Sequence, residues 1–389
     1  MTALVTQTDA APSTTSAPDA GPSSTAGASP VGLFDAVTLR GQTFRNRLWV
    51  APMCQYSAER EDGVATDWHL VHLGSLARGG AGAVISEAAS VTSDGRISPQ
   101  DLGIWNDEQV EALKPITAFV RSQGSVPGIQ LAHAGRKAST FRPWSEIQGS
   151  VPEAEGGWPT VAPSAVAFEG YAAPRELARD EVVGLVEAFR AAARRSVEAG
   201  FGLIELHAAH GYLLHQFLSP LSNERTDEYG GSLENRARLL VDVVRAVRAE
   251  VGDDLPLLVR FSATDWAEGG WDEHETATVA AWSRDAGADL FDISTGGLVA
   301  GVTIPAGLGY QVPFAQHVRE TAEVETGAVG LIVSARQAQA VVAEGRADVV
   351  LMAREFLRDP HFPLRAAAEL GVELDYWPEQ YLRAPFRTA

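Results

Sequence analysis

Eight short apolar runs recur between residues 48 and 352 and limit the folds open to this chain more than any other feature of its sequence. They are residues 48–51, 82–86, 128–132, 203–206, 257–261, 289–293, 329–333 and 348–352. Such short runs, bounded by glycine or proline, are typical of strands buried on both faces. Amphipathic segments that predict helices lie between most of them, at 108–123, 180–199, 233–250, 273–285 and 335–344. Eight β–α units in one chain predict an α/β fold, a closed (β/α)8 TIM barrel.

An open, doubly wound sheet is the alternative fold. No Gly-x-Gly-x-x-Gly follows the first run and no Walker phosphate loop occurs, which weakens the dinucleotide-binding form of that fold. The chain exceeds a minimal barrel by about 100 residues. The excess falls in segments that follow strands, at 136–176, 207–232 and 294–313. These segments predict extended loops at the carboxyl ends of the strands, where barrel enzymes hold their active sites.

Residues 1–30 form a separate segment, in which 24 of the 30 are Ala, Ser, Thr, Pro or Gly. Such a composition cannot bury enough apolar surface to order itself, so we expect a disordered tail followed by one barrel domain over 31–389. The segment has neither the basic start and apolar run of a signal peptide nor the arginines of a transit peptide. We therefore expect a cytoplasmic protein.

The charge and cysteine content narrow the possible partners. With 31 Lys and Arg against 50 Asp and Glu, the net charge is −19, which disfavours nucleic acid and anionic membranes as partners. No run of 18 apolar residues is present to span a membrane. The single cysteine, Cys54, excludes an internal disulfide and an all-cysteine metal cage.

The hexapeptide 207–212 is the most informative short segment. It places His207, His210 and Tyr212 together after the fourth predicted strand. Two imidazole N–H groups can hold one carbonyl oxygen, with the phenol as a proton donor. A metal site would need a third ligand, for which His133 is a candidate. A purely structural histidine pair is the third possibility.

Buried polar side chains mark other strand ends. Gln130 lies inside an apolar strand, so its amide either binds a ligand or ties neighbouring strands. Arg260 within the fifth strand predicts a ligand contact or a partner acid such as Glu205 or Glu87. Arg354 follows the eighth strand, where barrels commonly bind phosphate.

Three further residues follow the first and third strands, and each has two interpretations. Cys54 is either a buried small hydrophobe or a functional thiol. Tyr56 is either a phenol donor into the pocket or a packed ring. Lys137 is either a solvated loop charge or a site residue.

Taken together, the motifs resemble the old yellow enzyme family of FMN-dependent ene-reductases, and most closely its cysteine-containing, thermophilic-like bacterial branch. The resemblance covers residues 33–383. It rests on APMCQYSA (51–58), DLGIW (101–105), QLAHAGRKA (130–138), HAAHGYLLHQFLSPLSNERTDEYGGSLENRARLL (207–240), GAVGLI (327–332) and AREFLRDP (353–360).

The resemblance implies an FMN site with NADPH or NADH as reducing substrate, and no metal. The residues it assigns to FMN are Ala51, Pro52, Met53, Cys54, Ala88, Gln130, Arg260, Gly330, Ala353 and Arg354. Gln130 and Arg260 would contact the pyrimidine edge of the flavin, where Arg260 neutralises the negative charge of the reduced ring. The Cys54 sulfur would tune the flavin potential, and the region of Gly330 and Arg354 would hold the phosphate.

The resemblance also implies the substrate side of the site. His207 and His210 would bind the substrate carbonyl, and Tyr212 would protonate the α-carbon. Tyr56 would help to seat the ligand, and Lys137 matches a position near the entrance. Arg383 matches an arginine that this branch inserts into a neighbouring subunit, which implies a homodimer or homotetramer with shared sites.

Three features qualify the match. Position 51 is Ala where Ser or Thr is frequent, which removes a side-chain hydrogen bond to the ring. Position 353 is Ala where Gly is common, which tightens the turn before Arg354. The long motif at 219–238 is interpreted as structural, with Arg225, Asp227 and Glu234 bracing the loop.

The resulting hypothesis is an NADPH dehydrogenase that reduces α,β-unsaturated ketones or aldehydes in two half-reactions. A nicotinamide that acts as a substrate needs no domain of its own, which agrees with the missing dinucleotide fingerprint. The main alternative is a metal-dependent barrel hydrolase that uses His133, His207 and His210. A further alternative is a flavin-binding protein without turnover.

Overall fold

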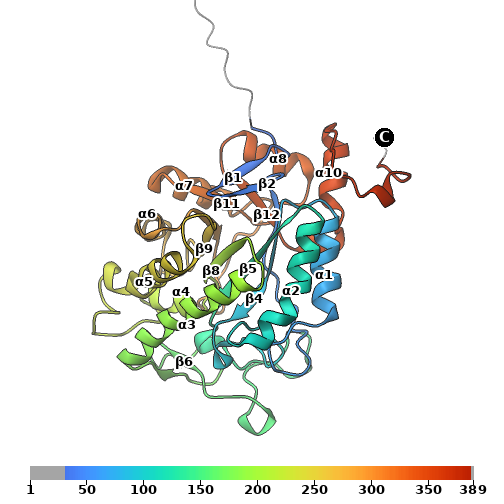
Figure 1. The fold of residues 1–389 in the computed structure, drawn as a ribbon. Coiled ribbons are helices and arrows are strands. Elements are labelled where there is room, and N and C mark those ends of the chain that lie inside the picture. The colour runs from blue at the N-terminus through green and yellow to red at the C-terminus, as the bar shows by residue number, and fades with distance from the viewer. Residues whose placement is uncertain (1–30, 387–389) are drawn as a thin grey trace, which may run out of the picture. The chain divides into compact units, whose positions relative to one another are not determined.

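The computed structural model describes residues 31–386. The disordered tail expected at residues 1–30 lies outside the described residues. Eight parallel strands close into a barrel in the order β3, β4, β5, β8, β9, β10, β11, β12 (Figure 1). Their bounds are Leu48–Val50, Ala83–Ser90, Val126–Ala132, Leu203–Ala208, Leu257–Ser262, Leu290–Ser294, Glu325–Ala328 and Val349–Met352. The predicted (β/α)8 barrel is therefore confirmed.

The structure confirms seven of the eight predicted strands, whereas the strand predicted at residues 329–333 is wrong. The apolar run 329–333 is the loop after β11, and the strand itself is the preceding segment Glu325–Ala328. The run cannot continue the strand because Gly330 and Leu331 have φ of 101° and 52°, which is left-handed backbone rather than extended backbone. The run is apolar because it lines the large cavity described below.

Helices surround the barrel, and the five predicted helices are confirmed to within one residue at each end. They are α2 (Asp107–Ser122), α3 (Arg179–Glu198), α5 (Leu233–Val251), α6 (Glu273–Ala286) and α8 (Ala335–Ala343). The others are α1 (Asp67–Arg78), α4 (Leu213–Leu218), α7 (Val312–Ala322), α9 (Arg354–Arg358) and α10 (Phe362–Leu370). Their buried faces form a continuous apolar layer with the outer side chains of the strands. This burial on both faces explains why the strands are continuously apolar.

Apolar side chains fill the lower half of the barrel interior and form a plug. The site must therefore lie above this plug, toward the carboxyl ends of the strands. A hairpin of β1 (Val37–Leu39) and β2 (Gln42–Phe44) covers the amino end of the barrel. Its Phe44 lies on the inward Trp49 with ring centroids 4.4 Å apart. Inward side chains from seven strands complete the plug, among them Ile85, Val126, Leu203, Leu258, Leu290, Val349 and Leu351. Buried polar side chains such as Gln130, Glu205 and Arg260 follow these apolar residues along the strands, toward the carboxyl ends.

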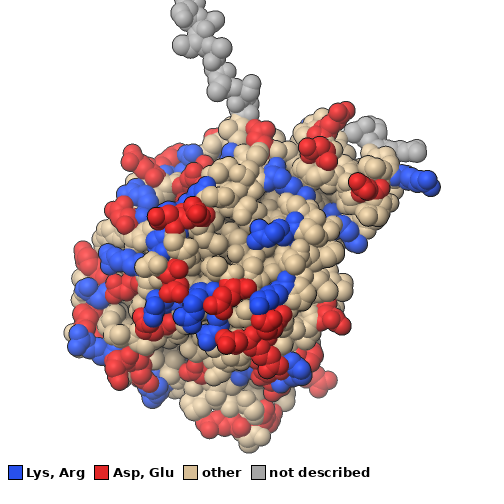
Figure 2. All heavy atoms as spheres, viewed as in Figure 1, with Lys and Arg blue, Asp and Glu red and all other residues tan. Residues whose placement is uncertain are grey.

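The loops after the strands are long, as predicted, and they build the face that carries the site. The segment after β5 includes a two-stranded parallel sheet of β6 (Val161–Ala162) and β7 (Arg175–Glu176). No helix among residues 31–386 combines the length and apolarity that a membrane crossing needs. On the face drawn in Figure 2, basic and acidic side chains are interspersed.

Candidate active site

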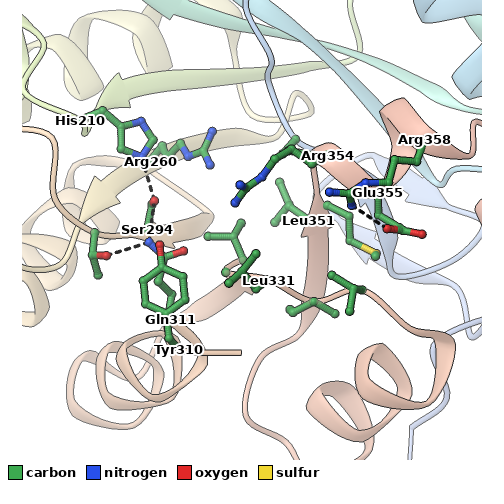
Figure 3. A pocket seen from close by; sticks show the side chains of 18 residues that line it. His210, Arg260, Ser294, Tyr310, Gln311, Leu331, Leu351, Arg354, Glu355 and Arg358 are labelled. Carbon is green, nitrogen blue, oxygen red and sulfur yellow. Dashed lines mark hydrogen bonds and ion pairs between the residues drawn. The ribbon is translucent and has the colours of Figure 1, made fainter. Parts of the chain in front are cut away.

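A cavity of about 790 Å³, counted with its open mouth, lies at the carboxyl end of the barrel. This is the size of pocket that holds a cofactor or a drug-sized ligand. Six predicted cofactor or substrate residues line it: Ala51, His210, Arg260, Gly330, Ala353 and Arg354. Figure 3 shows Arg260 and Arg354 entering the cavity from opposite sides. The structure thus brings together residues that are far apart in the sequence.

One end of the cavity is built to receive an anion. Arg354 and Arg358 begin and end the short helix α9. Arg358 pairs with Glu355 at 3.0 Å, whereas Arg354 makes no ion pair within residues 31–386. Gly330 lines the same space with φ of 101°, and a Cβ there would lie 2.8 Å from the Gln311 side chain. Only glycine fits this position, and its absent side chain leaves room for a ligand close to the backbone.

Ala353 stands where glycine is common before Arg354. Its φ of −110° and ψ of −86° lie outside the usual helical and extended regions, but φ is negative, so the position does not require glycine. The tightened turn expected from the sequence does not cause left-handed backbone.

A histidine, histidine and tyrosine cluster lies beside the cavity at the end of β8. The rings of His207 and His210 have centroids 5.3 Å apart, and those of His207 and Tyr212 lie 4.9 Å apart. Burial is the main cause that lowers the pKa of both histidines well below the usual value, and Arg260 adds to it. Both imidazoles are therefore neutral at pH 7, with one N–H donor each. Nδ1 of His207 is buried and has no hydrogen-bond partner among residues 31–386, so it is available to a ligand.

The backbone at His210 is held in an uncommon conformation. Its φ is 57°, which costs free energy in a non-glycine residue and is found most often at functional sites. The Ser262 hydroxyl accepts from the backbone N–H of His210 at 2.9 Å, and Ser294 Oγ lies 2.8 Å from its ring Nε2. The Gln311 amide donates to Ser294 Oγ at 3.2 Å. These contacts fix the imidazole before any ligand binds.

Lys137 joins two of the site loops. Its Nζ donates to the carbonyl oxygens of His210 at 2.9 Å and Gly297 at 3.0 Å, and it lies 5.2 Å from the centre of the Tyr212 ring. Burial lowers the pKa of Lys137 to about 8, with a smaller contribution from Arg136. Lys137 is therefore no solvated loop charge, and its ammonium holds the loop that carries His210.

Buried charges lie below the histidines, and they correct one expectation. Arg260 on β9 pairs with Asp292 on β10, with Nε and Oδ2 2.9 Å apart. Neither of the predicted partner acids holds that place. Glu87 pairs with His69 at 3.2 Å, and Glu205 accepts a hydrogen bond from the Gln130 amide at 2.7 Å. Gln130 thus ties β5 to β8, one of the two roles open to it.

The first strand end brings Cys54 and Tyr56 to the same cluster. Their side chains pack against a small apolar group that includes Ala88 and Ala132. Burial is the main cause that raises the pKa of the Cys54 thiol, and Asp101 and Glu87 add to it, so the thiol is protonated at neutral pH. Pro52 and Met53 lie between Ala51 and Cys54 in the same segment after β3.

The other predicted residues lie apart from the cavity. His133 accepts from the backbone N–H of Gly135 and lines a different hollow, against α3. Within residues 31–386, no group of three or more His, Cys, Asp or Glu side chains is placed to hold a metal ion. The hydrolase alternative therefore lacks its third ligand. Arg383 is exposed on the segment after α10.

The long motif at 219–238 braces its own loop. Arg225 pairs with Asp227 at 2.5 Å and donates to the Leu177 carbonyl at 2.6 Å. Glu234 is exposed at the start of α5, and hydrogen bonds from its own backbone N–H and from the Ser232 side chain lower the pKa of its carboxyl group. Arg236 also braces the loop, because it pairs with Glu275 at 2.6 Å.

Several residues of the cavity were not predicted. Gln311, Ser294, Thr295 and Arg358 line it, and Asp292 pairs with Arg260 below it. The serine, threonine and glutamine lie in or beside the loop after β10, and a search of that loop for side-chain donors would have found them. Asp292 lies one residue before the end of the predicted strand 289–293, and the charge inside an apolar run was its signal.

Comparison with known proteins identifies relatives over nearly all of the described chain. The family model for the NADH:flavin oxidoreductase / NADH oxidase family matches residues 32–373. An NADPH dehydrogenase of Listeria monocytogenes is 47% identical over 353 residues, which are 90% of this chain and 98% of that protein. Among solved structures, morphinone reductase has a TM-score of 0.73 and 29% identity, over 90% of this chain and 92% of its own. The old yellow enzyme homologue of Zymomonas mobilis has a TM-score of 0.73 and 29% identity, over 92% of this chain and 100% of its own.

Proposed function

This chain belongs to the NADH:flavin oxidoreductase / NADH oxidase family and is an FMN-dependent NADPH dehydrogenase of the old yellow enzyme type, and from this premise we propose that it reduces α,β-unsaturated carbonyl compounds. The reduced bond is the activated carbon–carbon double bond. The observation that carries the proposal is the cluster of two neutral imidazoles and a phenol, in which the ring centroid of His207 lies 5.3 Å from that of His210 and 4.9 Å from that of Tyr212.

The residues of the cavity fit FMN. Arg354 offers an unpaired positive charge for the phosphate, and Gly330 leaves the space that a Cβ would fill. At the other end, Arg260 lines the cavity, and the N–H groups of its guanidinium that do not face Asp292 would donate to a flavin ring. When bound, FMN would supply the hydride chemistry that links NADPH to the β-carbon of the second substrate.

The chain's own residues bind and polarise that substrate. His207 and His210 donate hydrogen bonds to its carbonyl oxygen, which draws electron density away from the β-carbon. Because both imidazoles are neutral, each binds the oxygen without transferring a proton to it. Burial raises the pKa of Tyr212 well above its usual value, so the phenol holds its proton until the α-carbon takes it.

Replacing both histidines tests the proposal. Each donor contributes about 2–4 kcal/mol to the transition state, so His207→Ala/His210→Ala should slow reoxidation of reduced enzyme by cyclohexenone at least ~1,000-fold. Weaker binding of phenols should accompany this loss, while FMN stays bound. His72→Ala, on the outer helix α1, is the control. Loss of FMN, or an unchanged rate, would show that the two histidines have another role.

Tyr212→Phe separates the proton donor from the binding groups. The variant should bind phenols as the wild type does, because the two N–H donors remain, but its enone turnover should fall. If the chain binds FMN without catalysing this reaction, the wild-type protein will contain FMN, but an enone will not reoxidise its reduced flavin. That outcome would favour the non-catalytic alternative.

The oligomeric part of the prediction concerns Arg383, which is exposed on the terminal segment. We propose a homodimer or homotetramer in which Arg383 enters a neighbouring site. Arg383→Ala should then raise the KM for enones without changing the mass of the assembly. A monomer in analytical ultracentrifugation would contradict the proposal.

A further inference from the structure

Two carboxyl groups and one guanidinium are buried together inside the barrel, directly below the flavin site. Glu205 on β8 and Asp292 on β10 are both 0% exposed, and Arg260 on β9 is 8% exposed. The strand register places Arg260 opposite Asp292 and places Gln130 opposite Glu205. All four side chains stand above the apolar plug that fills the lower barrel.

The charges of this cluster do not balance if both acids are ionised. One positive charge would then face two negative charges in a space without solvent, at a cost of several kcal/mol. Like charges that share a buried site avoid this cost by retaining a proton. The hydrogen bonds indicate which acid holds it, because Asp292 pairs directly with Arg260 at 2.9 Å whereas Glu205 accepts only from the neutral amide of Gln130.

The second oxygen of Glu205 supports this assignment. Within the described part of the chain, Oε2 of Glu205 is buried and has no hydrogen-bond partner, and both oxygens of Asp292 lack a hydrogen bond of good geometry. A proton on Glu205 would turn an unpartnered acceptor into a donor. Burial and Asp292 raise the pKa of Glu205 to about 8, while Arg260 opposes them.

We propose that Glu205 and Asp292 are positioning residues that share one proton below Arg260, and that this proton sets the charge that Arg260 presents to the flavin. Protonated Glu205 leaves a single ion pair under the ring. Ionised Glu205 adds a negative charge there and makes the gain of electrons by the flavin less favourable. The inference rests on the proposed place of Arg260 beside FMN, but not on the enone reaction.

The groups that face Glu205 come from four strands. Arg260 on β9 and Asp292 on β10 are its charged neighbours, β5 contributes the uncharged Gln130, and its own strand contributes His207, which is neutral. Reduction by NADPH supplies two electrons. The negative charge that the flavin gains raises the proton affinity of Glu205. Above pH 8 the ionised Glu205 therefore takes up a proton from solvent when the flavin is reduced. No bond of the flavin is broken in this proton uptake.

The test is the midpoint potential of the FMN in the holoenzyme as a function of pH. Above about pH 8, coupling to one further proton should add a tenfold change in the redox equilibrium per pH unit, which is 29.6 mV for two electrons. Glu205→Gln keeps the shape and cannot ionise, so this additional slope should vanish. Glu87→Gln, a buried acid that pairs with His69 instead, is the matched control and should keep it. No break in the wild type, or a break that persists in Glu205→Gln, would overturn the proposal.

Asp292→Asn provides a second variant. Removing the acid that pairs with Arg260 should move the break below pH 8 and raise the midpoint potential above pH 8, where Glu205 and Asp292 are both ionised in the wild type. An unchanged potential above pH 8 would overturn the role of Asp292, while normal FMN content in the same sample would leave the proposed enzyme function intact.

Stability gives a readout that does not depend on the flavin potential. Glu205 binds its proton more tightly in the folded chain than in the unfolded chain, so wild-type stability relative to Glu205→Gln should fall as pH rises from about 5 to 8. The ratio of their unfolding constants should change tenfold per pH unit, or about 1.4 kcal/mol. If Glu205→Gln does not fold, infrared difference spectra of the wild type decide. A protonated-carboxyl band that shifts on flavin reduction supports the proposal, and its absence overturns it.

Discussion

Lys137→Met should slow the enone half-reaction while leaving the fold nearly as stable, because Lys137 positions His210 without contributing much net stability. The ammonium joins the His210 carbonyl at 2.9 Å to the Gly297 carbonyl at 3.0 Å. Methionine has a similar length and no donor. The loop that carries His210 would therefore lose its tie to the loop after β10.

Two opposing energies determine the stability of this variant. Hydrogen bonds from a charged amine to carbonyls contribute about 1.5–3 kcal/mol each. Burial lowers the pKa of Lys137 from 10.5 to about 8, and this desolvation costs about 3 kcal/mol. The two contributions largely cancel, so the free energy of unfolding at pH 7 should change by at most about 3 kcal/mol. Catalysis should suffer more, because a displaced catalytic group can cost about 10- to 100-fold in rate.

Anaerobic stopped-flow is the assay: reduced enzyme is mixed with cyclohexenone and the return of flavin absorbance is followed. Lys114→Met is the matched control, since Lys114 is the other lysine of the chain and pairs on the surface with Glu111 alone. An unchanged rate in Lys137→Met would refute the positioning role. A large loss of stability would refute the cancellation.

The same lysine predicts a pH effect of definite sign. Between pH 8 and 10.5 the unfolded chain binds the proton of Lys137 more tightly than the folded chain does. The stability of the wild type relative to Lys137→Met should therefore rise with pH over that range, by up to about 1.4 kcal/mol per pH unit. A falling difference in urea titrations would contradict it.

Three further variants test separate parts of the account. Gly330 has φ of 101°, and a Cβ added there would lie 2.8 Å from the Gln311 side chain. Gly330→Ala should therefore weaken FMN binding about tenfold or more, as measured by flavin fluorescence. An unchanged affinity would show that the space at Gly330 is not needed to hold FMN. Cys54→Ala should shift the flavin potential and keep turnover detectable, whereas complete inactivity would mean that the thiol is chemically required. Asn223→Ala removes two hydrogen bonds of 2.7 and 2.8 Å to loop carbonyls and should lower the free energy of unfolding by about 2–4 kcal/mol with an unchanged flavin spectrum; a changed spectrum would contradict a purely structural role for this loop.

The barrel could be predicted because strand burial and helix periodicity are local signals. The seventh strand shows the limit of that signal. Apolar residues in 329–333 line a cavity, and apolar residues in a buried strand look the same in sequence. The left-handed backbone at Gly330 and Leu331 separates the two cases, and only Gly330 hinted at it.

The residues of the site could be predicted where a motif or a strand end marked them, as for His207, His210 and Arg354. Their partners could not. Nothing near Arg260 in the sequence indicates Asp292, because the pair forms between neighbouring strands whose register depends on closure of the whole barrel. Lys137 likewise binds carbonyl oxygens, which every residue carries, so no sequence pattern could identify its partners.

The measurement that tests the central claim most directly is the visible spectrum of the purified protein through one catalytic cycle without oxygen. The account predicts a yellow flavin band that bleaches with one equivalent of NADPH and returns with one equivalent of cyclohexenone, with one equivalent of cyclohexanone formed. A band that bleaches and stays bleached after the enone is added would contradict the proposed reaction, and a protein that takes up no FMN would contradict the cofactor site as well.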